Sequence, residues 1–391
     1  MTNEDLDTRG AEMKESDELK SSGAGGSGGY RGQVVYIYAF DIAYDMKRLS
    51  IPVLAGQKVE EYTIGPSKRS PKQAFFYRPQ MIRMAAEEKQ IGGKSVMVEQ
   101  SVKIFNVGAI SIQIRIPFEA VRFEDIVSYH EPIFDDGDVQ SHANEMAERI
   151  RQELLPYCVK PIEQLGQAEA YTIFCLDELP ASEKNGIKME EWLMKNRRLT
   201  AGLLTEEAPE SLSEQEVLES TEQYVSYYEK DLVVMDWDAA LVVGQGESLD
   251  EVLHIMELAN VQLVELAAYD RIMDGALEGA YRDLARRRVR RSGDVRQNLR
   301  EMRVDLSRFN DELLNIRKFF GDWYLAKIYR SISERFHLAD WQDIINEKIK
   351  TLGDLYQFLQ QDWVNVMMVV MEAAIVFLFI VDLIILLLGM P

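Results

Sequence analysis

Cysteine and histidine are scarce in this chain of 391 residues, which excludes several classes of protein. Two cysteines, Cys158 and Cys175, cannot form the disulfide framework of a small secreted domain, and a reducing compartment suits them. The four histidines lie at no spacing typical of a metal site; they are His130, His142, His254 and His337. We therefore expect histidines that are either hydrogen-bonded within the protein or exposed at its surface, and we expect no metal and no cofactor.

Catalytic motifs are also lacking. The sequence contains no nucleophile elbow, no HExxH pair and no paired-carboxylate motif. The turn Gly244-Gln245-Gly246-Glu247 precedes a helical pattern but lacks the third glycine and the lysine of a phosphate loop. We expect a protein that is not an enzyme. An enzyme that uses an unrecognised site within residues 33–245 stays open as an alternative.

Positively charged residues are outnumbered, since the chain has 44 Lys and Arg and 65 Asp and Glu, which gives a net charge of −21. The chain as a whole is therefore no polyanion binder. One basic island interrupts the acidic sequence between Arg282 and Arg308, without an aromatic residue from Val289 to Val304 that could stack on a base. As its polyanion-binding residues we predict Arg286, Arg287, Arg288, Arg290, Arg291, Arg296 and Arg300, with RNA, a ribosome or anionic lipid as partner. A solvated tip that pairs with the protein's own acids is the alternative.

The N-terminus has no apolar signal region, and the long apolar run lies at the other end, at Asn365–Met390. A helix over the 23 residues from Val366 to Leu388 would span about 35 Å, against roughly 30 Å of bilayer hydrocarbon. We predict a transmembrane anchor over residues 363–391. Lys348 and Lys350 precede it and nothing basic follows, so the positive-inside rule predicts a single-pass protein with a cytoplasmic N-terminal domain.

Two acids, Glu372 and Asp382, interrupt the apolar run. An acid at the centre of a membrane helix costs roughly 2.5 to 3.5 kcal/mol. Ten residues at 100° each leave the two about 80° apart, so they can face one sector of the helix. We predict that they make contacts between transmembrane helices in a homo-oligomer; an ion path and a merely tolerated acid are the alternatives.

Before the anchor, the pattern predicts an α+β protein. Residues 1–32 form a polar, Gly/Ser-rich tail that we expect to be disordered. Residues 33–245 form a mixed α+β domain. We expect its strands at 34–39, 95–105, 109–117, 170–176, 232–237 and 240–243, and its helices at 42–49, 118–129, 138–155, 192–204 and 213–230.

Residues 246–362 carry three heptad seams, which predict a long antiparallel helical (coiled-coil) hairpin followed by a stalk. The first begins after the capping box Ser248–Glu251 and is broken only by Asp270. It runs through Val252, Met256, Ala259, Leu263, Leu266, Asp270, Met273, Leu277, Ala280 and Leu284. The second runs from Val295 to Phe320, after the turn Ser292-Gly293. The third runs through Leu338, Trp341, Ile345, Lys348, Leu352, Leu355 and Leu359.

The order of features after Asp231 resembles the "required for meiotic nuclear division" family of bacteria and mitochondria. Short strands (LVVMDWDAALVVG) precede an Ala-rich helix (ANVQLVELAAYD), a hairpin, an aromatic segment (FFGDWYLAKIY) and an apolar run with two acids ten residues apart, Glu372 and Asp382. The resemblance covers mainly residues 231–391. It implies a membrane-anchored, oligomer-prone protein without enzymatic activity.

The function we expect is a non-catalytic membrane-anchored tether or scaffold that acts through an oligomeric helical hairpin with a basic tip. Its partners would be the lipid bilayer and further copies of itself. The alternative is a subunit of an oligomeric cation transporter that resembles the CorA channels. Against it, Gly389-Met390 is followed by Pro391 rather than Asn, and a second span is missing.

Overall fold

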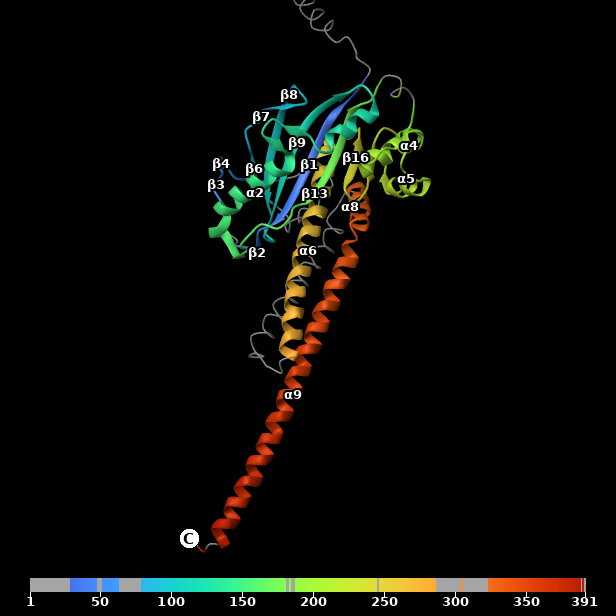
Figure 1. Ribbon diagram of the computed structural model, residues 1–391. Coiled ribbons are helices and arrows are strands. Elements are labelled where there is room, and N and C mark those ends of the chain that lie inside the picture. Colours follow the sequence, from blue (N-terminus) through green and yellow to red (C-terminus); the bar gives the residue numbers. More distant parts are fainter. Residues whose placement is uncertain are drawn as a thin grey trace, which may run out of the picture.

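The computed structural model describes residues 29–47, 51–62, 79–180, 183, 187–244, 246–285, 304, 323–387 and 389. Within them the fold class is α+β, as predicted: a large sheet with helices on both faces, from which a long helix projects (Figure 1). Residues 1–28 of the predicted tail 1–32, the second heptad seam and the turn that precedes it lie outside the described residues, apart from Val304. Residues 30–32 of that tail begin the strand Tyr30–Asp41 instead, because they pair with residues 118–120.

The described strands are short at the sheet's rim and long at its centre. They are β1 (Tyr30–Asp41), β2 (Ala43–Met46), β3 (Val53–Leu54), β4 (Gln57–Lys58), β5 (Glu60–Glu61), β6 (Gln80–Arg83), β7 (Glu87–Ile91), β8 (Lys94–Ile104), β9 (Ala109–Ala120), β10 (Ile133–Phe134), β11 (Gly137–Asp138), β12 (Cys158–Pro161), β13 (Glu169–Glu178), β14 (Tyr224–Val225), β15 (Leu232–Met235) and β16 (Ala239–Val243). The helices are η1 (Phe123–Tyr129), α2 (Val139–Leu154), η2 (Leu155–Tyr157), α4 (Met189–Thr205), α5 (Glu214–Ser220), η3 (Gly246–Ser248), α6 (Leu249–Ala285), α8 (Trp323–Arg335) and α9 (Leu338–Leu387).

Twelve of these strands join into one sheet, with the order β11-β10-β7-β8-β9-β1-β13-β16-β15-β14; β6 pairs with β8, and β5 pairs with β6. Its central strands are buried on both faces, which explains the nearly continuous apolar sequence of β1. Tyr36 and Tyr38 of β1 face a core shared with η1, α2 and α4. Val35 and Ile37 face a second core shared with α6, α8 and the start of α9.

Helix α9 is 50 residues long, or about 75 Å at 1.5 Å per residue. Its first part packs against α6. The two helices run in the same direction, because Lys348 contacts Asp270 while Leu352, further along α9, packs with Ala280, further along α6. The first predicted seam therefore packs on the third. The part of α9 from Val364 to Leu387 is a candidate membrane span, with none of its described side chains buried and a mean hydropathy of 2.8.

Three predicted helices differ from the structure. Residues 43–46 of the predicted helix 42–49 form strand β2, because this segment pairs with β12 and its neighbour Ile42 donates a backbone hydrogen bond to Gly108. The predicted helix 118–129 is helical only from Phe123, because β9 continues to Ala120 to pair with β1. The predicted helix 213–230 ends at Ser220, since residues 224–225 pair with β15. In each case strand pairing across the sheet outweighs local helical periodicity.

Candidate functional site

A polar cluster lies where the first turns of α6 cross β8 and β9. On α6, Asp250, His254 and Glu257 are spaced by four and three residues, so they share one face of the helix. On β9, Ser111 and Gln113 alternate with the isoleucines of the opposite core and point toward α6. The sheet face under α6 is thus apolar on β1 and β13 but polar on β8 and β9.

The centre of the cluster is a buried ion pair between Lys103 of β8 and Glu257 of α6. Ser111 donates its hydroxyl hydrogen to the other oxygen of the same carboxylate, at 2.7 Å. Lys103 Nζ also lies 3.3 Å from His254 Nδ1 and 4.0 Å from the centre of the Tyr62 ring. The ammonium therefore has a partner for each of its three hydrogens, as a buried charge requires.

The protonation of this cluster follows from burial and from Lys103. Burial lowers the pKa of His254 to about 4, helped by the neighbouring ammonium of Lys103. The imidazole is then neutral near pH 7, and its Nδ1 accepts a hydrogen from Lys103, because an ammonium has no acceptor. Burial alone would raise the pKa of Glu257, but Lys103 and His254 hold it at about 2. Glu257 is therefore a carboxylate that neutralises Lys103.

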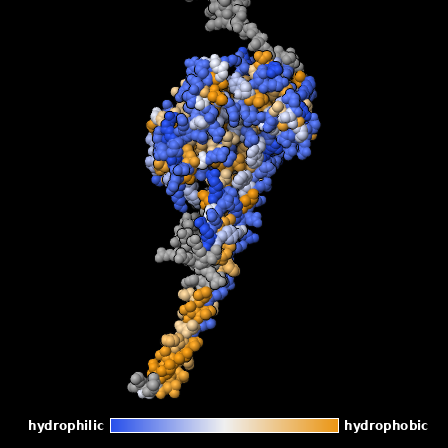
Figure 2. All heavy atoms as spheres, viewed as in Figure 1, coloured by the Kyte–Doolittle hydropathy of each residue, from blue (hydrophilic) through white to orange (hydrophobic). Residues whose placement is uncertain are grey.

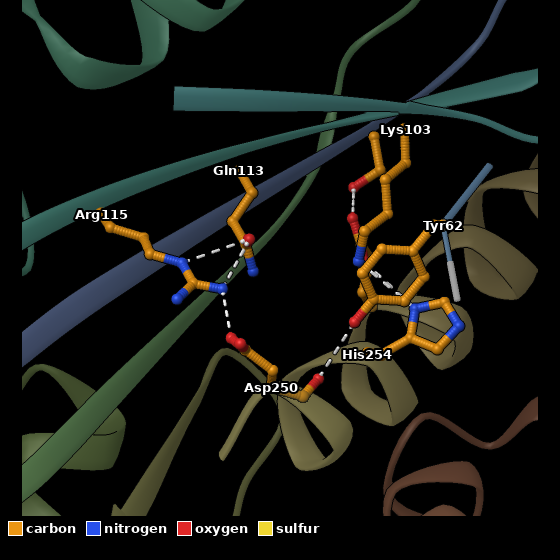
Figure 3. Close-up of polar contacts among 8 residues, drawn as sticks. Tyr62, Lys103, Gln113, Arg115, Asp250 and His254 are labelled. Carbon is orange, nitrogen blue, oxygen red and sulfur yellow. Dashed lines mark hydrogen bonds and ion pairs between the residues drawn. The ribbon is translucent and has the colours of Figure 1, made fainter. Parts of the chain in front are cut away.

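A second polar group lies beside this pair (Figure 3). Arg115 of β9 donates from Nη2 to Asp250 at 2.8 Å and to Gln113 Oε1 at 3.2 Å. The Tyr62 hydroxyl lies 3.5 Å from the backbone oxygen of Asp250, and its ring packs 4.7 Å from that of His254. Burial, and then Glu257, raises the pKa of Tyr62 above its usual value, so Tyr62 stays protonated.

These side chains border a cavity of about 270 Å³ that opens beside β6, β8 and β9. Three cationic side chains line it, those of Arg83, Lys103 and Arg115, together with the acids Glu99 and Asp250. Gln113 is buried and also lines the cavity, and its Nε2 has no hydrogen-bond partner among the residues that the structure describes. The arrangement can bind a small polar ligand, and it offers more donors than acceptors.

The polar cluster contains none of the residues predicted as sites. The polyanion-binding residues Arg286, Arg287, Arg288, Arg290, Arg291, Arg296 and Arg300 all lie outside the described residues. Glu372 and Asp382 are exposed on α9, within the candidate span. Across the described ranges, no group of three or more His, Cys, Asp or Glu side chains is placed to hold a metal ion.

The four histidines have separate surroundings. His130 contacts the backbone oxygen of Leu203, and His337 contacts Asp340 at 3.0 Å. His142 contacts Gln100 at 3.1 Å on the sheet face opposite α6. Only His254 belongs to the polar cluster.

The glycine turn before α6 has a structural role. Gly244 has a φ of +71°, and a Cβ there would lie 2.3 Å from the backbone oxygen of Lys230. The positive φ and the close contact both favour glycine at this position, so the backbone itself explains Gly244 and no ligand is needed to explain it.

Sequence reasoning missed the cluster, although its signals were present. The alternation of Ile110, Ile112 and Ile114 indicates one apolar face of the strand, and Ser111 and Gln113 between them indicate a second face that is polar. The spacing of His254 and Glu257 on an otherwise apolar helix face was the other signal. Their proximity to Lys103, about 150 residues away in sequence, comes only from the fold.

Comparison with known proteins finds a distant relative and a family model that match this chain. It is 23% identical over 245 residues to "Uncharacterized protein MJ0711" of Methanocaldococcus jannaschii, a match that covers 61% of this chain and 72% of that protein. No solved structure matches the chain. Neither finding supports the resemblance to the "required for meiotic nuclear division" family. Residues 31–249 match the model of the family described as "Uncharacterized protein MJ0711, N-terminal domain", and since they make up more than half of the chain, the chain belongs to that family.

Proposed function

We propose that this protein is a non-catalytic membrane-anchored tether or scaffold, whose head, the sheet with its covering helices, is held at the bilayer by α9. The observation that carries the proposal is the continuity of α9, which packs against α6 in its first part and becomes an exposed apolar helix from Val364 to Leu387. Figure 2 contrasts the mostly hydrophilic head with the hydrophobic far part of this helix. An exposed apolar surface of this size fits lipid or another helix and is unfavourable in water.

The orientation is part of the proposal. Lys348 and Lys350 precede the span, which favours a cytoplasmic head under the positive-inside rule. Homo-oligomers and polyanion binding by the arginine island are further parts, supported by the sequence patterns. The resemblance to the meiotic-division family is retained here only for residues 231–391, which lie mostly beyond the matched domain.

Fractionation tests the anchor. The full chain should stay in membranes washed with alkaline carbonate, whereas a chain without residues 364–391 should move to the soluble fraction with the circular dichroism of a folded head. As a matched control, an unrelated apolar helix of equal length in place of 364–387 should restore membrane retention. A folded, truncated chain that remains in carbonate-washed membranes would refute the anchor.

Labelling tests the orientation. Cys158 and Cys175 are both buried, so a cysteine introduced at the exposed Val121 would be the main reactive thiol of the described head. A membrane-impermeant maleimide should label Val121→Cys only after the cells are permeabilised. Labelling in intact cells would place the head outside.

A further inference from the structure

The cavity between β6, β8, β9 and the start of α6 contains a buried donor without an acceptor. Gln113 is 3% exposed, and its Oε1 accepts hydrogen bonds from Arg115 Nε and Nη2, at 3.4 and 3.2 Å. Because Arg115 has only donors, the amide must turn its oxygen toward it. The Nε2 of Gln113 is thereby left without a partner among the described residues. A buried donor left unsatisfied costs about 1–3 kcal/mol, so an occupant that accepts a hydrogen bond here would be favoured.

The side chains around this donor define the charge of the occupant. Lys103 is saturated by Glu257, His254 and the Tyr62 ring and offers nothing further. Arg83 is exposed on β6 and forms no ion pair or hydrogen bond within the described part of the chain. It lies in the same sheet row as Gln113, because Arg83 pairs with Ser101, and Ser101 pairs with Gln113. A guanidinium on β6 and an unsatisfied amide hydrogen on β9 thus face the same cavity from two strands that both pair with β8.

We propose that this cavity binds a small oxyanion, a carboxylate or phosphate group, held by the guanidiniums of Arg83 and Arg115 and by the amide of Gln113. Two guanidiniums and an amide supply charge-assisted donors of the kind that recognise these groups. A volume of about 270 Å³ suits a small ligand and lies just below the range of drug-sized pockets. Asp250 and Gln113 already occupy Arg115 Nη2, and Gln113 occupies Nε, so an oxyanion would bind Nη1 or displace the Asp250 carboxylate.

Glu99 limits which anion fits. It lines the cavity and is the cross-strand partner of Arg115, so a ligand must avoid its carboxylate or donate a hydrogen to it. A fully ionised, highly charged anion is therefore disfavoured relative to one with a hydroxyl or protonated oxygen beside its charge. Monohydrogen phosphate and hydroxycarboxylates satisfy this condition, since each carries an acceptor oxyanion and a donor hydroxyl.

The test uses the full chain in detergent and two probes, inorganic phosphate and lactate, with chloride at equal ionic strength as reference. Calorimetry should show saturable binding of at least one probe in the unmodified chain. Binding of phosphate alone or of lactate alone identifies the group that is preferred, and binding of both identifies the shared oxyanion chemistry. Arg83→Gln should weaken that binding at least tenfold, equivalent to about 1.4 kcal/mol. Arg31→Gln, which removes an exposed arginine of β1 whose ion pairs with Glu119 and Glu178 lie at the surface, should leave that binding unchanged.

A second variant separates binding from folding. Gln113→Glu removes the unsatisfied donor but keeps an oxygen that accepts from Arg115, so it should leave the ligand-free chain folded with an unchanged thermal midpoint, while it weakens binding of the same probe. The proposal is overturned if neither probe binds more than chloride at millimolar concentration, in which case the cavity holds only water. It is also overturned if Arg83→Gln and Arg31→Gln bind the probe equally well.

Discussion

At the scale of single residues, the charge of Lys103 is the feature that most needs a compensating partner, because it is buried inside the protein. Lys103 and Glu257 are both buried, so each ion has lost most of its hydration and depends on the other. Such a pair adds little net stability compared with an apolar pair, but removing one partner leaves an uncompensated charge. The cluster therefore fixes how α6 sits on β8 and β9.

Glu257→Gln should lower the free energy of unfolding by about 3–5 kcal/mol, because Lys103 would keep its charge without a carboxylate. Urea unfolding of the full chain in detergent, followed by near-ultraviolet circular dichroism, measures the change. The double variant Lys103→Met/Glu257→Leu should recover most of the loss. Glu119→Gln, in a surface pair with Arg31, is the control and should change stability little. A loss in Glu257→Gln no larger than in the control would contradict this account.

The buried His254 predicts a pH dependence. Its pKa is near 4 in the fold, through burial and then Lys103, against 6.5 for an unperturbed imidazole. Between pH 4 and pH 6.5 the unfolded chain binds more protons than the folded chain, so the free energy of unfolding rises with pH across this window. The contribution of His254 to stability is therefore lost as the pH falls from 6.5 to 4. The slope from this residue is at most about 1.4 kcal/mol per pH unit.

His254→Gln keeps an acceptor for Lys103 but does not titrate, so its unfolding free energy should fall less between pH 6.5 and pH 4 than that of the unmodified chain. Asp41 acts with the opposite sign, since burial raises its pKa to about 6, but it is present in both chains and cancels from the difference. Parallel pH profiles for the two chains would show that His254 is not buried as a neutral imidazole.

At the scale of secondary-structure elements, the packing of α6 on α9 explains two charged residues within apolar seams. Asp270 alone interrupts the first seam, and Lys348 lies in the third. The structure pairs them, with Lys348 Nζ 2.7 Å from Asp270 and 2.6 Å from Asp274. The pair fixes the register of the two helices, because sliding α9 by one turn would separate these charges by about 5.4 Å.

Lys348→Met should lower the thermal midpoint of the full chain, because it leaves Asp270 partly buried beside apolar side chains without a counter-charge. The double variant Asp270→Leu/Lys348→Met should restore the midpoint. Lys350→Met, an exposed position on the same helix, serves as control. If both single variants shift the midpoint equally, the ion pair does not contribute to the packing of α6 on α9.

In the candidate span of α9, we expect Asp382 to contact another helix. A protonated carboxyl can donate across a helix interface, a bond worth about 0.6–2 kcal/mol in a bilayer. Asp382→Asn keeps donor and acceptor and should preserve oligomers in detergent, measured by light scattering, whereas Asp382→Leu should weaken them. The transporter alternative predicts instead a cation flux in liposomes that both variants abolish. Observing that flux, with oligomers unchanged in both variants, would favour the transporter.

At the scale of the whole molecule, a net charge of −21 contrasts with ten arginines between Arg282 and Arg308. Opposite potentials on one chain repel a polyanion from the acidic surface and attract it to the basic segment.

Replacing Arg286, Arg287, Arg288, Arg290 and Arg291 with Gln should abolish binding of the full chain to RNA or anionic vesicles. The unmodified chain should lose affinity steeply as salt rises, through counterion release. Five arginines or lysines of the head replaced in the same way provide the control. Absence of binding at low salt in the unmodified chain would leave the island as a solvated tip.

The sequence by itself determined the features that depend on local pattern. Alternation of apolar residues in residues 95–105 and 109–117 predicted the central hairpin β8–β9, and the long apolar run, with only two acids in it, predicted the candidate span. Secondary structure can be predicted from such patterns because the period of apolar residues along a segment indicates which of its side chains share one face.

Only the tertiary structure decided what depends on partners distant in sequence. Residues 43–46 have helical periodicity but form a strand because β12 lies beside them. Asp270 interrupts an apolar seam in the sequence, and only the structure shows that Lys348 of α9 pairs with it. The cavity likewise depends on the fold, because Tyr62, Gln113 and Asp250, which line it, come from three separate segments. A buried charge or donor is stabilised by whatever atoms pack around it, and no single stretch of sequence contains that information.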